Sequence, residues 1–137
     1  MGLFGKASKR ELEDSDFGRL TEETPRSWLG NAFQLWGSAS IQIMIDAGKE
    51  GPSADQRSFV RSLRTNEEVR ARIEQTVAKQ ARDTTRKSAA LHLTSIYFPP
   101  SPSTQVWRLW FDMEGEEDYS FGAEIEGLNR IIPFAED

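Results

Sequence analysis

Alternation of apolar and polar side chains on both sides of a helix-like middle limits the folds open to this chain. Residues 40–46 place three isoleucines on one parity, and residues 106–112 and 119–126 repeat the pattern with aromatic and aliphatic side chains. Successive side chains of a strand point to opposite faces of a sheet, so a period of two predicts half-buried strands. We therefore expect a sheet with one apolar face that other elements cover.

The middle of the chain carries signals for two helices. Ser53 is typical of an N-cap, and Gln56 completes a capping box, so a helix should run from about 54 to 64. Asn66 is a second N-cap candidate, and Glu67 and Glu68 follow it, where the helix dipole favours negative charge. The second helix should run to about residue 87. Four apolar residues spaced four apart give it a narrow buried stripe: Val69, Ile73, Val77 and Ala81.

These elements predict an α+β domain. Strands are expected at 16–22, 27–35 and 40–46 before the helices, and at 91–98, 106–112 and 119–126 after them. A short last strand at 130–134 should lie at an edge, because Pro133 has no N–H to donate. Short turns favour antiparallel pairing. The prediction is an antiparallel sheet of about six strands with both helices packed on one face, in the order βββ-αα-βββ.

Length and composition predict one cytoplasmic domain. The 137 residues suit a single domain, with residues 1–15 as a flexible N-terminal tail and 16–137 as the folded part. Residues 1–10 lack the apolar run of a signal peptide, and no stretch reaches the roughly 18 apolar residues of a membrane span. The chain has no cysteine, which excludes disulfides, thiolate nucleophiles and Cys-ligated metals and fits a reducing compartment.

Charge is distributed unevenly along the chain. The net charge is −5, but residues 57–87 hold nine basic and four acidic side chains, whereas residues 112–137 hold nine acidic side chains and only Arg130 as a base. A negative protein is a poor match for nucleic acid, whose binders neutralise phosphates. The asymmetry either steers a charged partner or reflects two solvated faces.

No residue pattern predicts catalysis, a cofactor or a metal centre. His92 is the only histidine, so neither a usual triad nor a histidine-based zinc site is available, and it is expected to be an ordinary strand residue. Any two of the 22 acidic residues could converge as a hydrolytic pair, but nothing singles out two of them. The sequence leaves enzymatic activity open and favours a non-enzymatic role.

Two tryptophans on one strand predict a binding surface. Trp107 and Trp110 are three residues apart and so face opposite sides, one in the core and the other on the open face beside Arg108. A tryptophan next to an arginine is a frequent composition of binding hot spots. The alternative is that the N-terminal segment or neighbouring residues cover Trp110.

The turn after that strand is the densest acidic cluster: Asp112, Glu114, Glu116, Glu117 and Asp118. Such a run suits a solvated hairpin turn. It also suits a patch that binds a partner, and several carboxylates around a turn can ligate calcium, although the EF-hand spacing is missing. We take these residues, with Arg108 and Trp110, as the candidate partner-binding set.

The layout of several short motifs resembles known bacterial families. An early Asp-Phe-Gly at 16–18, Trp-x-Gly at 28–30, an Ile-rich strand and Tyr-Ser-Phe-Gly-Ala-Glu-Ile at 119–125 are similar to small bacterial domains of unknown function. Some of those families resemble immunity proteins that neutralise polymorphic toxins. The resemblance implies a binding role toward a basic protein surface and assigns no functional residue.

The leading hypothesis is a non-catalytic bacterial domain that binds another protein, with neither nucleic acid nor membrane as a partner. The alternatives are a small-molecule binding domain, with its pocket between sheet and helices or on the Trp110 face, and a hydrolase using paired carboxylates. An uncovered edge near Ile131 would also allow two copies to pair across a two-fold axis as a homodimer.

Overall fold

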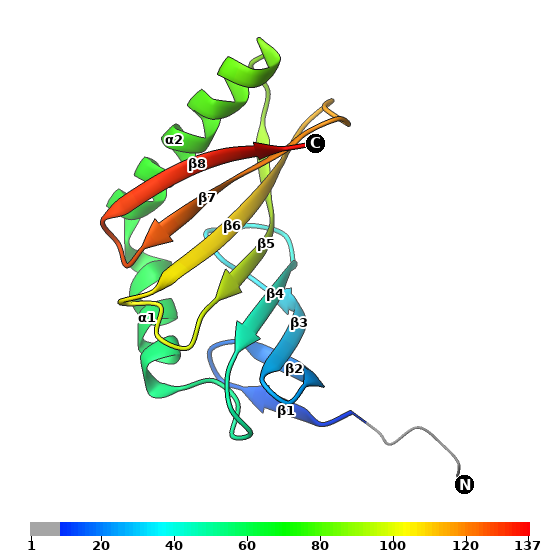
Figure 1. The fold of residues 1–137 in the computed structure, drawn as a ribbon, viewed down its shortest axis with the longest axis vertical. Coiled ribbons are helices and arrows are strands. Elements are labelled where there is room, and N and C mark those ends of the chain that lie inside the picture. The colour runs from blue at the N-terminus through cyan, green and yellow to red at the C-terminus, as the bar shows by residue number, and fades with distance from the viewer. Residues whose placement is uncertain (1–8) are drawn as a thin grey trace, which may run out of the picture.

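Within the part of the chain that the structure describes, one eight-stranded sheet is backed on one face by two helices (Figure 1). The computed structural model describes residues 9–137. The strands are β1 Glu11–Asp14, β2 Gly18–Thr24, β3 Ser27–Phe33, β4 Ile41–Asp46, β5 Leu91–Phe98, β6 Val106–Met113, β7 Ser120–Glu126 and β8 Arg130–Glu136, and the helices are α1 Ala54–Thr65 and α2 Glu67–Thr85.

The strands lie in the sheet in the order in which they occur in the chain, from β1 to β8. Every neighbouring pair is antiparallel except β4 and β5 at the centre, which are parallel. The helices form the crossover that a parallel pair requires. The sheet therefore consists of two four-stranded meanders joined side by side along β4 and β5.

The prediction of a six-stranded antiparallel sheet ordered βββ-αα-βββ is wrong: the sheet is mixed and has eight strands. The extra N-terminal strand, β1, lies in residues that we expected to belong to a tail, because Leu12 is the only large apolar residue among charged ones. It pairs with β2 over four residues, so the sheet begins at Glu11 rather than near residue 16. The tail prediction for residues 1–8 lies outside the described residues.

The helix caps have the geometry that the sequence predicts. The Ser53 side chain accepts from Gln56 N, and the Gln56 side chain accepts from Ser53 N at 2.8 Å. Gln56 has a second role, because its buried Nε2 donates to the carbonyls of Asp46 and Pro99 at 2.7 and 2.8 Å. Asp46 is the last residue of β4 and Pro99 directly follows β5, so one side chain connects α1 to both parallel strands. The second helix is capped by Asn66, which accepts from Val69 N.

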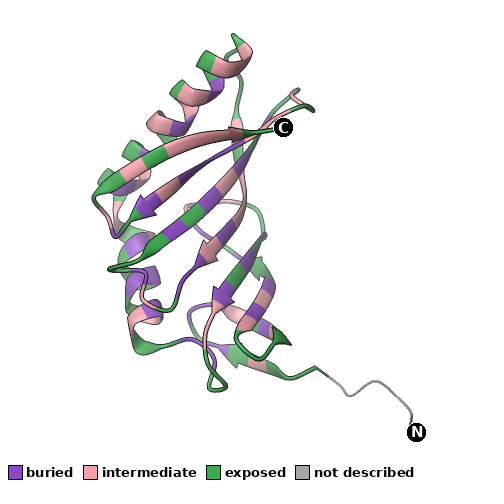
Figure 2. Ribbon diagram, in the orientation of Figure 1, coloured by how far each residue is buried: buried purple, intermediate pink, exposed green. Residues whose placement is uncertain are grey.

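Large side chains fill the space between sheet and helices. Buried and exposed residues alternate along β4 and β6 (Figure 2), as a sheet with one covered face requires. Phe59 of α1 contacts Phe98 and Trp107 edge-on, and the latter two rings stack at 5.9 Å. The Trp107 indole N–H donates to Gly127 O at 2.7 Å, which satisfies its one donor inside the core.

Two buried carboxylates fasten the β1–β2 turn to α1. Asp14 accepts from the backbone N–H groups of Asp16 and Phe17 and from Arg57 Nε at 2.7 Å. Arg61 binds Asp16 with two hydrogen bonds of 2.8 and 2.9 Å. The Arg61 hydrogen bond, opposed by burial and aided by the charges of the nearby arginines, lowers the pKa of Asp16.

Among the described residues, neither helix has the length and apolarity needed to cross a lipid bilayer.

Candidate functional site

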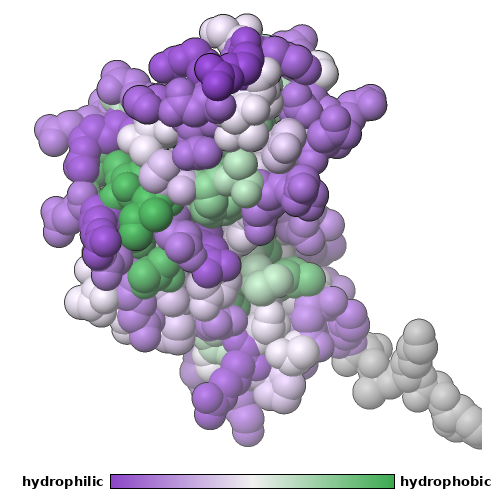
Figure 3. Space-filling view, turned by 45° about the horizontal axis from the view of Figure 1, so that its top comes forward, coloured by the Kyte–Doolittle hydropathy of each residue, from purple (hydrophilic) through white to green (hydrophobic). Residues whose placement is uncertain are grey.

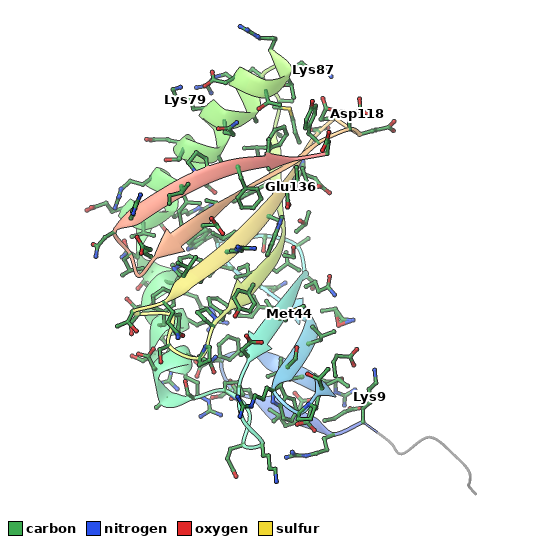
Figure 4. The ribbon with its side chains drawn as sticks, in the orientation of Figure 1. Lys9, Met44, Lys79, Lys87, Asp118 and Glu136 are labelled. Atoms are coloured by element: carbon green, nitrogen blue, oxygen red, sulfur yellow. The ribbon has the colours of Figure 1, made fainter. Side chains whose placement is uncertain are left out.

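The face of the sheet opposite the helices is uncovered and carries apolar side chains. Met44, Val106 and Ile132 are the large hydrophobic residues most exposed, at 44%, 38% and 41%. They belong to β4, β6 and β8, on the parity that alternates with the core. Apolar atoms reach the surface in patches separated by hydrophilic side chains (Figure 3), and Met44 projects near the middle of this face (Figure 4).

The strand register aligns one row of open-face residues from β3 to β7, across the junction of the two meanders. Leu29 pairs with Met44, and Met44 pairs with Tyr97 across the parallel junction. Tyr97 then pairs with Arg108, and Arg108 with Glu124. Directly paired residues bring their Cβ atoms to about 5 Å. The row therefore starts apolar, passes through a tyrosine and ends in an ion pair.

A groove of about 740 Å³ runs over this row and toward the start of β7. It draws on five strands, from β3 to β7. Its lining mixes apolar, hydroxyl, amide and charged side chains: Leu29, Gln42, Met44, Thr94, Ser95, Ile96, Tyr97, Val106, Arg108, Trp110, Asp112 and Ser120.

Trp110 forms one wall of the groove and is held from the side by β8. The Phe134 ring meets it edge-on, with centroids 6.2 Å apart, and the indole N–H donates to Glu136 Oε1 at 2.9 Å. Phe134 lies over Gly122, where a Cβ would come within 2.5 Å of the phenyl ring. The missing side chain of Gly122 thus lets Phe134 support Trp110. The indole is half-buried, and neighbouring residues of β8 supply part of the cover that the alternative expected.

Polar groups of the groove are fixed by neighbours on the same face. Arg108 is ion-paired with Glu124, its register partner. The Tyr97 hydroxyl donates to Asp46 Oδ2 at 2.7 Å. Burial, with the Asp46 hydrogen bond and charge as further causes, raises the pKa of Tyr97 to about 12. The tyrosine is therefore a neutral hydrogen-bond donor at any physiological pH.

The structure separates the predicted partner-binding residues into two groups. Arg108, Trp110 and Asp112 line the groove. The rest of that set lies in the turn between β6 and β7, at the end of the sheet where Glu136 and Asp118 appear in Figure 4: Glu114, Glu116, Glu117 and Asp118.

Glu116 is not free for a partner. Its carboxylate accepts from Asp118 N at 3.0 Å and from Lys87 Nζ at 3.2 Å. The backbone hydrogen bond and the Lys87 contact lower the pKa of Glu116. This side chain therefore connects the turn to the segment after α2. Glu114 faces His92 at 3.8 Å, with both side chains exposed.

Sequence reasoning missed the half of the groove contributed by β3, β4 and β5. Leu29, Met44 and Tyr97 alternate with the core residues of their strands. This alternation could have placed them on the open face. Nothing local shows that β4 and β5 are neighbours, because parallel and antiparallel strands share the same period. Without that pairing, the row from Leu29 to Arg108 has no sequence signal.

The buried carboxylates are engaged by arginine, and no metal-binding cluster is present among the described residues. The two buried carboxylates, Asp14 and Asp16, are each bound by arginine and lie against α1. In residues 9–137 no three His, Asp or Glu side chains are placed to hold a metal ion together. The open face presents apolar, aromatic, hydrogen-bonding and charged groups.

Comparison of the chain with protein-family models, with curated proteins and with solved structures found no match.

Proposed function

We propose that this domain binds another protein through the open face of its sheet, in the groove between Met44 and Trp110. The observation that carries the proposal is the combination, in one groove, of a half-buried tryptophan, an arginine two residues away and exposed aliphatic side chains. Aromatic residues, methionine and arginine are enriched in protein interfaces, whereas surfaces without a partner expose few large apolar groups together.

The groove is preorganised for binding. Trp110 is held by Phe134 and Glu136, Arg108 by Glu124, and Tyr97 by Asp46. Side chains that are already ordered lose less conformational entropy when a partner arrives, which favours affinity. The non-enzymatic binding role that the sequence resemblance implies agrees with this proposal.

Site-specific photocrosslinking in host cells tests it. A photoreactive amino acid in place of Met44 should form a discrete adduct with one protein. The same amino acid in place of Lys79, whose side chain is 72% exposed on α2, gives the matched control and should form none. Adding Val106→Lys, in the lining of the groove, should reduce the Met44 adduct at least five-fold by placing a charge in an apolar contact.

Absence of any adduct from position 44 and from a second groove position, 106, would overturn the proposal, provided that both variants are as stable as the unmodified protein. Equal adducts from positions 44 and 79 would do the same, because they would show contact without a preferred face.

The groove volume supports a second candidate, a small-molecule ligand. About 740 Å³ lies within the range of roughly 300–1,000 Å³ typical of ligand pockets. A thermal-shift screen with metabolites tests this, since a ligand that binds only the native state raises the unfolding temperature. A hit that Trp110→Ala abolishes and Lys79→Ala leaves unchanged would favour this candidate over a protein partner.

A further inference from the structure

Resting on the proposed function, we infer that the partner segment is cationic and amphipathic: it places an apolar side chain in the groove and lysine or arginine beside Asp46, Asp112 and Glu136. The inference concerns the chemistry of the occupant, which the proposal of a protein partner leaves open. It is carried by the distribution of charges over the two faces of the molecule.

Glutamates already pair with three exposed arginines of the sheet, Arg108, Arg130 and Arg19. Arg108 pairs with Glu124, and Arg130 pairs with Glu126 at 3.5 Å. At the far side of the sheet Arg19 contacts two glutamates of β1, the nearer, Glu13, at 3.1 Å. These cations are therefore poorly available to attract an anionic partner.

Carboxylates that no arginine or lysine of the described chain contacts lie at both ends of the groove. Asp46 lies two residues beyond Met44, and among the side chains described its carboxylate accepts only from the Tyr97 hydroxyl. Asp112 lines the opposite end. Glu136 borders the Trp110 wall and uses one oxygen for the indole N–H. An apolar floor between separated carboxylates complements an apolar side chain flanked by cations.

The helical segment has a net excess of basic side chains, although most of them are also ion-paired. Residues 57–87 hold nine basic and four acidic side chains, and Lys79 and Lys87 mark this segment in Figure 4. Arg57 and Arg61 are bound by the buried Asp14 and Asp16, but both keep exposed surface. The protein thus carries a negative and a positive side, which would orient an approaching cationic segment toward the open face.

The dimensions of the groove suit a short segment. From β3 to β7 it spans four strand spacings, roughly 19 Å at about 4.8 Å each. A helix of about 13 residues has that length, as do about six extended residues. One or two large apolar side chains with cations on either side fit such a span.

Two designed peptides test the inference. The first is an 18-residue helical peptide with leucine on one face and lysine on the other, and the second has glutamate at every lysine position. Fluorescence anisotropy at low ionic strength should show at least ten-fold tighter binding of the lysine peptide. Backbone amide shifts in an NMR titration should map that binding to β4, β5 and β6.

Charge-removing variants locate the effect. The double variant Asp112→Asn with Glu136→Gln keeps the size of both side chains and leaves an oxygen to accept from the Trp110 N–H. It should weaken binding of the lysine peptide about five-fold, which is the effect expected from the loss of two exposed ion pairs. Glu74→Gln with Asp83→Asn removes two carboxylates from α2 and should change binding less than two-fold.

The outcomes separate the two proposals. Equal binding of both peptides at the groove would overturn the inference that the partner is cationic. The proposal that the open face is the docking surface would still hold. If both double variants weaken binding of the lysine peptide equally, the binding depends on the net charge of the protein and not on the groove carboxylates. That result would overturn the inference. Binding of neither peptide would also overturn it, and the photocrosslinking at position 44 would then decide the proposed function independently.

Discussion

The hydroxyl of Tyr97 donates a 2.7 Å hydrogen bond to Oδ2 of Asp46, joining side chains from the two parallel strands at the centre of the sheet. The bond lies on the open face, beside the groove, and it exists only while the tyrosine keeps its proton. The titration of this residue therefore reports on the junction of the two meanders.

Tyr97 should titrate well above an ordinary tyrosine. Its folded pKa is raised to about 12, so the stability it contributes is complete below the unfolded value near 10 and is lost as the pH rises from 10 to 12. Absorbance at 295 nm in a Tyr119→Phe background isolates this group. Asp46→Asn should lower the midpoint, because it removes a negative charge that opposes ionisation. An unshifted midpoint near 10 in the parent would contradict the observed burial and hydrogen bond.

Replacing Gln56 by leucine should cost about 2–3 kcal/mol of unfolding free energy. The change removes two buried hydrogen bonds, to the carbonyls of Asp46 and Pro99, each worth about 1–1.5 kcal/mol, and it also breaks the capping box. Urea denaturation measures the loss. Gln75→Leu, on the exposed side of α2, is the control and should stay within about 0.5 kcal/mol of the parent.

Gly122→Ala should destabilise the protein by about 1–3 kcal/mol and loosen the Trp110 wall. The new methyl group would meet Leu109 O and the Phe134 ring, so the strand or the ring must move. Urea denaturation gives the stability, and acrylamide quenching should increase as Trp110 becomes more accessible. Gly48→Ala has free space and no left-handed backbone, so it should leave both readouts unchanged.

Asp16→Asn should destabilise the protein at pH 7 and much less at pH 2. Because arginine contacts lower the folded pKa of Asp16, its stabilisation is full above the ordinary value near 3.8 and is lost as the pH falls through the folded value. The difference in unfolding free energy between parent and variant should therefore narrow on acidification. A gap that stays constant from pH 7 to pH 2 would show that the loss is one of packing rather than of charge.

The sequence predicted the helices and most strands because capping residues and apolar periodicity lie within the elements or directly beside them. Ser53, Gln56 and Asn66 cap helices as expected, and Trp107 and Trp110 lie on opposite faces, which alternation alone dictates. β1 could not be predicted, since its pairing with β2 stabilises a segment that has little apolar content of its own.

The candidate site depends on pairing that no local pattern encodes. Arg108, Trp110 and Asp112 were identifiable from one strand, but Met44 and Tyr97 join them only because β4 lies parallel to β5. Likewise Glu116 looks like a free carboxylate in the sequence, whereas Lys87, 29 residues away, contacts it in the structure. Long-range contacts of this kind depend on the whole fold.

The strict chain order of the sheet has a consequence for how the protein folds. Neighbouring strands within each meander are close in the chain, whereas residues 47–90, including both helices, separate β4 from β5. Closing a long loop costs more entropy than closing a hairpin and slows folding. We therefore expect the rate-limiting transition state to be the docking of two preformed halves, with substitutions at Ile43 and Ile96 slowing refolding more than those at Phe121.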